Sequence, residues 1–492
     1  MNRSILIGFV VATLPIASQL ASQQKPSPLA PYISVTASVL VLQHATLIDG
    51  TGSAPQMDMR IDIAGDKIIA VQPSNSSVPL PYGAKVLDLT GKTVIPGLVG
   101  MHEHLFYPMP ERPDAGNALY GEMADSAPRL YLAGGVTTAR TAGSVEPYTD
   151  LELKKQIDAG LIPGPNLDVT GPYLEGKGTF ALQMRQLADA DDAARTVEYW
   201  AAEGVTSFKA YNYITSDELR MAIRHAHFHG LKITGHLCSI GFKEAAELGI
   251  DNLEHGIVVD TEFYPGKQPD VCPDAGAAER DLENNVNMTG PDVTSMILDL
   301  VQHHVAVTST LAVLETFMPN RPSMTFESPV LKTLTPEAVR SYLETRMRIA
   351  DRAANPDVLE RGAPSKILKL EMQFEREFVA AGGLLMAGCD PTGYGGVVPG
   401  FGDQRNIELL VEAGFTPVEA IQIATLNGAK YMRKDTAIGS IAPGKTADLV
   451  VLDGNPAENI ANIEKVDTVF KDGVGYDPAK LIQSVTGLVG LR

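Results

Sequence analysis

Short apolar strands alternate with helical segments along most of this chain, from about residue 93 to residue 432. Residues 205–211, for example, are a predicted strand, residues 216–229 a helix, and residues 231–236 the next strand. Such alternation is typical of a parallel sheet covered by helices, and this many units indicates that the sheet closes on itself. The sequence therefore predicts an α/β fold with a TIM-like (α/β)8 barrel.

Alternation of apolar and polar residues, as in β-strands, appears on both sides of this region. The simplest explanation is a small β-sandwich domain assembled from both ends of the chain. We therefore predict a composite β domain at 35–97 and 433–480 and a barrel at 98–432. Two long segments, 257–294 and 315–375, interrupt the barrel, and loops of this length usually carry function.

The N-terminus has the features of a secretory signal peptide over residues 1–22, because Arg3 precedes an apolar run at residues 5–16. A run of about 12 residues is too short to span a bilayer, which takes about 20. We therefore expect an exported enzyme, periplasmic or secreted, without a stable membrane span. An uncleaved anchor or a buried helix is the alternative.

Charge and cysteine content narrow the classes of function. The net charge of −19 over 492 residues argues against nucleic-acid binding, which needs clustered Lys and Arg. The expected partners are a small-molecule substrate and further copies of the chain in a homo-oligomer. Cys238, Cys272 and Cys389 are an odd, sparse set, which indicates neither a disulfide framework nor a zinc finger. Any metal would then be held by His, carboxylate or modified Lys.

Two sets of histidines share a two-residue spacing. His102 and His104 lie in a predicted strand, where residues two apart point the same way, so both imidazoles can face one metal while Glu103 faces outward. His225, His227 and His229 lie late in a predicted helix, where residues two apart diverge. We expect this second set to cap and solvate the helix end.

Four further candidates, Lys209, His236, His255 and Asp390, each come at the end of an apolar strand. A charged Lys is costly to bury, so Lys209 is interpreted as an amine that has captured carbon dioxide, giving a carbamate that bridges two cations. The alternatives are a surface lysine, structural histidines and a helix-capping aspartate. Taken together, four His, one Lys and one Asp at five strand ends predict a binuclear metal site.

The chain resembles the amidohydrolase superfamily, in particular the imidazolonepropionase-like branch with its Xaa-Pro dipeptidases and ochratoxin-degrading amidohydrolases. The segments that carry the resemblance are VIPGLVGMHEH, GVTTAR, FKAY, TGH, NLEHG, AGCD and IGSIAPGKTADLVVLDGNP. The resemblance implies that His102, His104 and Asp390 bind the more buried metal. It also implies that His236 and His255 bind the more exposed metal and that carboxylated Lys209 bridges both. Zinc is the default metal for this set of ligands.

The predicted reaction is hydrolysis of an amide- or peptide-type bond in an N-acyl amino acid, a dipeptide or an aryl amide. Hydroxide held between the two metals would attack, with Asp390 as general acid and base. Tyr211 or Tyr213 would donate a hydrogen bond to the substrate carbonyl.

Arg140, Lys177 and Arg185 are candidates for gripping a substrate carboxylate, with ordinary framework or surface cations as the alternative. Two departures from the dipeptidase-like relatives leave the substrate open: Ala139-Arg140-Thr141 after the second strand, and the loop 171–178 after the third.

Three other functions stay open at this point. The same site would serve a lactonase or a phosphotriesterase. A cyclic-amide hydrolase or deaminase would hold one metal rather than two. A barrel that only binds a ligand or partner would not need the complete set of metal ligands.

Overall fold

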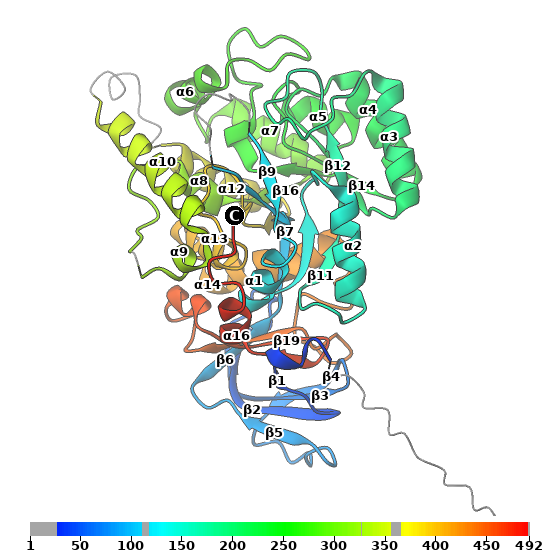
Figure 1. The fold of residues 1–492 in the computed structure, drawn as a ribbon, viewed down its shortest axis with the longest axis vertical. Coiled ribbons are helices and arrows are strands. Elements are labelled where there is room, and N and C mark those ends of the chain that lie inside the picture. Colours follow the sequence, from blue (N-terminus) through cyan, green and yellow to red (C-terminus); the bar gives the residue numbers. More distant parts are fainter. Residues whose placement is uncertain (1–26, 111–117, 326, 356–365, 491–492) are drawn as a thin grey trace, which may run out of the picture.

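The structure is a computed structural model that describes residues 27–110, 118–325, 327–355 and 366–490 (Figure 1). The predicted signal peptide at 1–22 lies outside the described residues. Within the described ranges, every helix is too short or too polar to cross a membrane.

Nine parallel strands build the centre of the larger region. Three of them form one sheet: β7 (Leu98–Glu103), β10 (Val136–Thr141) and β11 (Asn166–Asp168). The other six form a second sheet: β12 (Thr170–Leu174), β13 (Ser207–Ala210), β14 (Lys232–Gly235), β15 (Asn252–Glu254), β16 (Ala306–Ser309) and β17 (Leu385–Ala387). Only Val169 separates β11 from β12, so together they occupy one position between β10 and β13. Eight strand positions therefore follow one another in chain order, as the α/β prediction requires.

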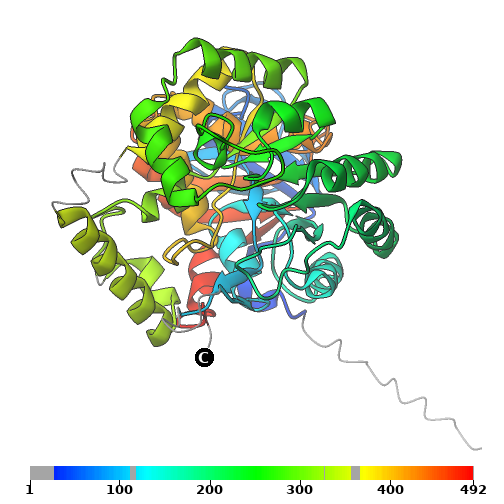
Figure 2. The ribbon, with the colours of Figure 1, turned by 90° about the horizontal axis from the view of Figure 1, so that it is seen from above.

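Helices connect these strands and lie around them when the molecule is seen from above (Figure 2). Those between strands are α1 (Ala127–Ala133), α2 (Pro147–Asp158), α3 (Ala190–Glu203), α4 (Ser216–Phe228), α5 (Phe242–Leu248), α7 (Pro291–Gln302) and α12 (Ile367–Ala380). Four more follow β17: α13 (Phe401–Glu412), α14 (Pro417–Gln422), the π-helical turn η3 (Ile423–Asn427) and α15 (Gly428–Tyr431).

Helix α4 shows how the sequence sets these elements. Thr215 accepts a hydrogen bond from the backbone N–H of Glu218, and the Glu218 carboxylate accepts one from the backbone N–H of Thr215, which starts the helix. The helix buries a stripe at helical spacing and ends before Gly230, whose φ is +69°. The buried residues of the stripe are Leu219, Ala222, Ile223 and Ala226.

Strands from both ends of the chain share one nine-stranded sheet, with the order β1-β20-β19-β18-β6-β2-β3-β4 and β5 beside β2. The N-terminal strands are β1 (Ile33–Val35), β2 (Val39–Leu47), β3 (Gln56–Ala64), β4 (Lys67–Pro73), β5 (Lys85–Asp88) and β6 (Lys92–Pro96). The C-terminal strands are β18 (Leu449–Asp453), β19 (Val466–Lys471) and β20 (Val474–Tyr476). This sheet lies below the parallel strands in Figure 1. The two-layer packing of a sandwich stays a prediction.

The two long segments contain helices beside the parallel strands and at the end of the molecule opposite the nine-stranded sheet (Figure 1). They are η2 (Gly256–Val259) and α6 (Ala275–Asn285) in the first segment, and α8 (Leu311–Thr316), α9 (Pro329–Thr333) and α10 (Pro336–Ala354) around the second. The remaining short elements are η1 (Ala30–Tyr32), β8 (Phe106–Pro108), β9 (Tyr120–Glu122), η4 (Ile460–Glu464) and α16 (Pro478–Gln483).

A disulfide joins Cys238, after β14, to Cys272 in the first long segment, and Cys389 is free and buried. The expectation that the cysteines form no disulfide framework therefore missed a real pair. The odd number of cysteines was misleading because a single bridge can exist beside one unpaired thiol.

Candidate metal centre

The structure brings the predicted ligands together at the carboxyl ends of the parallel strands. Asp390, three residues beyond β17, lies at their centre. Its carboxylate oxygens are 3.5 Å from His104 Nε2, 3.7 Å from His102 Nε2 and 3.8 Å from His255 Nε2. Ligand atoms of His102, His255 and Asp390 lie within 4.8 Å of one another, and all three residues are buried. Parallel strands end at one face, so residues far apart in the sequence meet there.

The rings of His102, His104 and His255 are each held through Nδ1. Glu254 Oε2 lies 2.7 Å from His102 Nδ1, the backbone oxygen of Gly143 3.2 Å from His104 Nδ1, and Thr310 Oγ1 2.7 Å from His255 Nδ1. Each Nε2 is thereby turned toward Asp390. Burial lowers the pKa of all three histidines, which favours the neutral imidazole that binds metals.

Lys209 reaches the same cluster from β13. Its side-chain nitrogen lies 3.2 Å from His102 Nε2, and the residue is only 1% exposed. Burial lowers the pKa of Lys209 to about 8. Lys209 is therefore a buried amine, and the alternative of a surface lysine is wrong.

His236 is held differently from the other histidines. Its ring lies 4.5 Å from the ring of His255 and 4.9 Å from that of Tyr211, measured between centroids. Its backbone N–H donates to the Ala210 oxygen at 3.1 Å. Among the described residues, neither ring nitrogen of His236 has a hydrogen-bond partner.

Two residues of the centre adopt a left-handed backbone although neither is glycine. The φ angles are +67° at His255 and +48° at Asp390. Such conformations cost of order 1–3 kcal/mol and occur preferentially at functional sites. They turn the chain sharply just where each side chain enters the cluster.

Glu254 is a functional candidate that the sequence reasoning missed. It is fully buried in β15 and accepts hydrogen bonds from Arg140 Nη2 at 2.7 Å and from Asn252 Nδ2 at 3.0 Å, besides its contact with His102. Although burial alone raises it, Arg140 and His102 hold the pKa of Glu254 well below its ordinary value. An acid at the end of a predicted strand, directly before a predicted metal ligand, was the available signal.

Of the three cations proposed to grip a carboxylate, two already bind carboxylates of the protein and the third is exposed. Arg140 is 1% exposed and donates to Glu254 and to the backbone oxygen of Met101. Arg185 makes two hydrogen bonds to Asp192, at 2.6 and 2.8 Å, and Lys177 is exposed. These positions favour the alternative of framework and surface cations.

Aromatic residues form one wall of the centre. Phe106 stacks on His104 at 4.4 Å, Tyr173 lies 4.9 Å from Tyr211, and Tyr211 contacts His236. Tyr213 is half-buried, and its backbone N–H donates to Glu175 Oε1 at 2.8 Å. Of the two predicted tyrosines, only Tyr211 thus has its ring against a candidate ligand.

The second histidine set lies away from the centre, as expected. His225 and His229 contact the two carboxylate oxygens of Glu198 on α3 at 2.6 and 2.7 Å, and His227 contacts Asp251 at 2.9 Å. All are partly exposed.

Behind the ligands, Glu103 joins the first and last parallel strands. Its carboxylate accepts a hydrogen bond from the Cys389 backbone N–H at 3.3 Å and lies 3.0 Å from Cys389 Sγ. Burial and then the neighbouring Asp403 raise the pKa of Glu103 well above its ordinary value. Glu103 faces away from the metal ligands, as predicted, into the protein interior.

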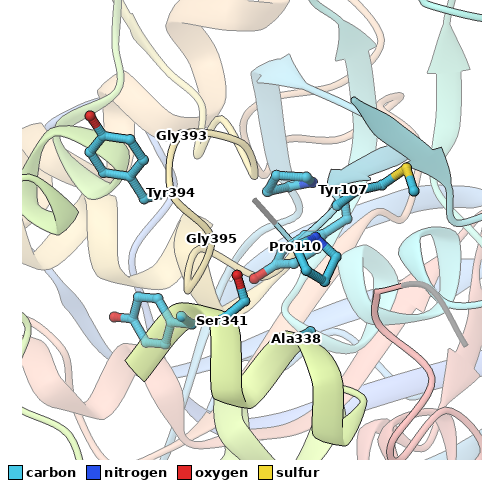
Figure 3. A pocket seen from close by; sticks show the side chains of 10 residues that line it. Tyr107, Pro110, Ala338, Ser341, Gly393, Tyr394 and Gly395 are labelled. Carbon is cyan, nitrogen blue, oxygen red and sulfur yellow. The ribbon is translucent and has the colours of Figure 1, made fainter. Parts of the chain in front are cut away.

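The loop after Asp390 borders a small cavity of about 30 Å³ (Figure 3). Tyr107, Ser341, Tyr342 and Tyr394 line it together with short residues of the loop. Its volume suits a water molecule or two but not a substrate.

Comparison with known proteins agrees with this arrangement. The sequence profile of the amidohydrolase family matches residues 93–275 and 349–474, more than half of the chain. An imidazolonepropionase of Streptomyces griseus subsp. griseus is 25% identical over 455 residues, which cover 88% of this chain and 96% of that protein. Adenine deaminase 2 of Jannaschia sp. is 39% identical over only 75 residues, which cover 15% of this chain and 12% of that protein.

Solved structures share the fold. A Xaa-Pro dipeptidase with bound methionine in the active site superimposes with a TM-score of 0.64 at 20% identity, covering 89% of this chain and 100% of the other. Ochratoxinase of A. niger superimposes with a TM-score of 0.60 at 17% identity, and the match covers 90% of this chain and 96% of the ochratoxinase chain. The predicted family resemblance is confirmed.

Proposed function

The chain belongs to the amidohydrolase family, and on this premise we propose that it hydrolyses an amide- or peptide-type carbon–nitrogen bond. The substrates we propose are N-acyl amino acids, dipeptides or aryl amides. The observation that carries the proposal is the buried group of His102, His255 and Asp390, whose ligand atoms lie within 4.8 Å of one another. Imidazole and carboxylate ligands that lie this close together are typical of a divalent metal site.

The donor set fits two divalent ions, with zinc as the expected metal. Three imidazoles are kept neutral by burial and present Nε2 to a common space, with their Nδ1 atoms engaged elsewhere. His102, His104 and Asp390 would hold one ion, and His236 and His255 the other.

Lys209 would complete this set as a carbamate. An ammonium group 3.2 Å from His102 Nε2 would repel a cation held by that histidine. Addition of carbon dioxide to the neutral amine forms a nitrogen–carbon bond and releases a proton, which leaves an anionic ligand with two oxygens. Such a ligand would help His102 and its neighbours to hold the divalent ions.

Bound divalent cations supply Lewis acidity and lower the pKa of a water molecule to near 7. Asp390 would accept the proton of the attacking water and return it to the leaving nitrogen. A hydrogen bond of 2.5 Å from Thr392 Oγ1 to Asp390 Oδ1 orients this carboxylate. Tyr211, whose ring contacts His236, would donate to the substrate carbonyl.

We further propose that the eight strand positions close into a barrel and that the enzyme is exported and oligomeric. Closure is supported by the Asp390 backbone N–H, which donates to the His102 oxygen at 3.0 Å and so links the last strand position to the first. Export is supported by the disulfide, since disulfides persist in oxidising compartments.

A second candidate is hydrolysis of a cyclic carbon–nitrogen substrate. The similarity to an imidazolonepropionase over 88% of this chain favours it. One bound metal per chain would support this function, whereas two would support the first.

One preparation tests both functions. Metal content would be measured on the purified protein, followed by turnover of N-acyl amino acids, dipeptides, aryl amides, a cyclic amide, a lactone and a phosphotriester. Two metals per chain with amide turnover are expected. Absence of bound metal, or faster turnover of the lactone or phosphotriester, would contradict the proposal.

A further inference from the structure

His236 lacks the ring hydrogen bond that positions the other three candidate histidines. Within the described residues its imidazole lies against the rings of His255 and Tyr211, and its ring nitrogens make no hydrogen bond. Stacking contacts allow a ring to slide and rotate more than a hydrogen bond does. The direction of the His236 side chain therefore depends on how firmly its backbone is held.

The turn that follows His236 is held from one side by the neighbouring strand end. The Ser239 backbone N–H donates to the Asn212 oxygen at 2.8 Å, and the Ser239 hydroxyl donates to the Ile214 oxygen at 2.5 Å. Asn212 and Ile214 follow β13, which carries Lys209. This side of the turn is thus tied to the rest of the candidate centre.

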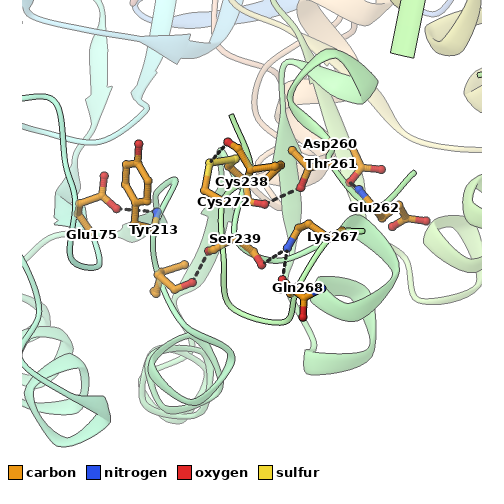
Figure 4. Close-up of a disulfide and its surroundings, with 12 residues drawn as sticks. Glu175, Tyr213, Cys238, Ser239, Asp260, Thr261, Glu262, Lys267, Gln268 and Cys272 are labelled. Carbon is orange, nitrogen blue, oxygen red and sulfur yellow. Dashed lines mark hydrogen bonds between the residues drawn. A yellow bond between two sulfur atoms is a disulfide. The ribbon is translucent and has the colours of Figure 1, made fainter. Parts of the chain in front are cut away.

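The other side of the same turn is held by residues 260–272 of the first long segment (Figure 4). Cys272 forms the disulfide with Cys238, Thr261 Oγ1 donates to the Cys238 oxygen at 2.6 Å, and Lys267 Nζ donates to the Ser239 oxygen at 2.6 Å. Three contacts, one of them covalent, therefore converge on two consecutive residues.

Residues 260–272 also grip the start of the next helix, α5. The Phe242 backbone N–H donates to Asp260 Oδ1 at 3.4 Å, and that of Lys243 donates to Glu262 Oε2 at 2.9 Å. The segment thus holds the chain from two to seven residues beyond His236. Apart from short turns it contains no helix or strand of its own, and its Asp270 also accepts hydrogen bonds from the backbone N–H and the hydroxyl of Ser216 at the start of α4, both at 2.6 Å.

We propose that residues 260–272 act as a clamp that positions His236 for metal binding, with the Cys238–Cys272 disulfide as its main fastening. The clamp replaces the missing ring hydrogen bond of His236 by fixing the backbone from which the side chain projects. This inference rests on the proposed function, because His236 is a metal ligand only there. Cys238, Cys272, Thr261 and Lys267 are positioning residues and do not touch the reacting atoms.

The test compares metal binding in the full-length wild-type protein and in Cys272→Ser, with zinc titrated against a chromophoric chelator. Loss of a contact that orients a metal ligand typically lowers affinity about 10- to 100-fold. We expect this loss for one of the two zinc ions only, with the ion at His102, His104 and Asp390 retained. Reduction of the wild-type protein with a phosphine, removed before the titration because thiol reductants bind zinc themselves, should give the same change, and the same treatment should have no effect on Cys272→Ser.

Lys267→Met is a second variant that leaves the disulfide intact. It should weaken the same zinc ion by a smaller factor, whereas the matched control Lys332→Met, at a lysine paired with Glu327 on the surface, should change neither ion. Circular dichroism establishes that each variant is folded.

Unchanged affinity for both ions in a folded Cys272→Ser protein would overturn the clamp. Equal weakening of both ions would do so as well, because the effect would then be general. A wild-type protein that binds no metal at all would instead contradict the proposed function.

Discussion

His102 and His104 share their two-residue spacing with His225, His227 and His229, and both sets contact carboxylates, yet their surroundings are opposite. Glu254 contacts His102 in the closed interior, with Arg140 on its other side. Glu198 contacts His225 and His229 between two helices at the surface. The comparison teaches that burial and the strand end, rather than spacing, distinguish a candidate metal centre from a solvated helix end.

The largest expected effect is on catalysis at the buried set. Asp390→Asn removes the proposed proton acceptor, and Lys209→Ala removes the bridging ligand, so each should lower kcat more than about 100-fold. Steady-state kinetics on the best amide substrate measures this. His227→Ala serves as the surface control and should retain wild-type turnover. A near-normal kcat in Asp390→Asn or Lys209→Ala would show that the buried residue is no more important for catalysis than the surface residue His227.

Next in size is the effect of the carboxylates on metal affinity. Glu254→Gln keeps the shape of the side chain but weakens its hold on His102, so zinc affinity should fall about 10- to 100-fold. The matched variant Glu198→Gln makes the same change at the surface and should leave zinc affinity unchanged. Chelator competition gives both values. Equal affinities in the two variants would show that Glu254 does not orient a ligand.

A smaller effect is expected where the partner of a buried histidine is neutral. Thr310→Val removes the hydroxyl at 2.7 Å from His255 Nδ1. Neutral hydrogen bonds are weaker than those to a charged group, so zinc affinity should fall about 10-fold, less than in Glu254→Gln. The same titration ranks the two variants. A larger loss in Thr310→Val would reverse the order of importance proposed for these partners.

The smallest effect concerns stability at the surface set. Hydrogen bonds from His225 and His229 lower the pKa of Glu198, so this carboxylate contributes stability above its ordinary pKa of 4.5 and loses it as the pH falls further. Glu198→Gln should therefore lower Tm slightly at pH 5.5, and the difference should be smaller at pH 3. Thermal unfolding at both pH values checks the sign. A Tm difference that grows toward pH 3 would contradict it.

Strand ends were the most predictable part of the site. Apolar runs that stop at Lys209, His236 and His255 predicted both the parallel strands and the shared face, because side chains at the carboxyl ends of such strands converge. The structure brings these residues to one cluster with His102 and Asp390. Spacing on a strand also predicted correctly that Glu103 would face away from them.

Contacts between distant segments were not predictable from the sequence. Arg140 was interpreted as a candidate for the substrate, yet it lies against Glu254, a residue 114 positions away. Cys238 and Cys272 gave no local pattern for pairing, because the segment between them folds back only in three dimensions. Periodicity reports which face of an element a residue lies on, but not which distant partner it meets.

The sheet shared by both chain ends has a consequence for how the protein is made. β1 pairs with β20, where the Ser34 hydroxyl also donates to the backbone oxygen of Gly475, 441 positions later, and β6 pairs with β18. The first strands to leave the ribosome must wait for the last ones before the sheet is complete, and contacts of such long range form slowly. The N-terminal strands β2 to β6 can pair with one another, but the partners of β1 and β6 are missing until β18 to β20 have been made.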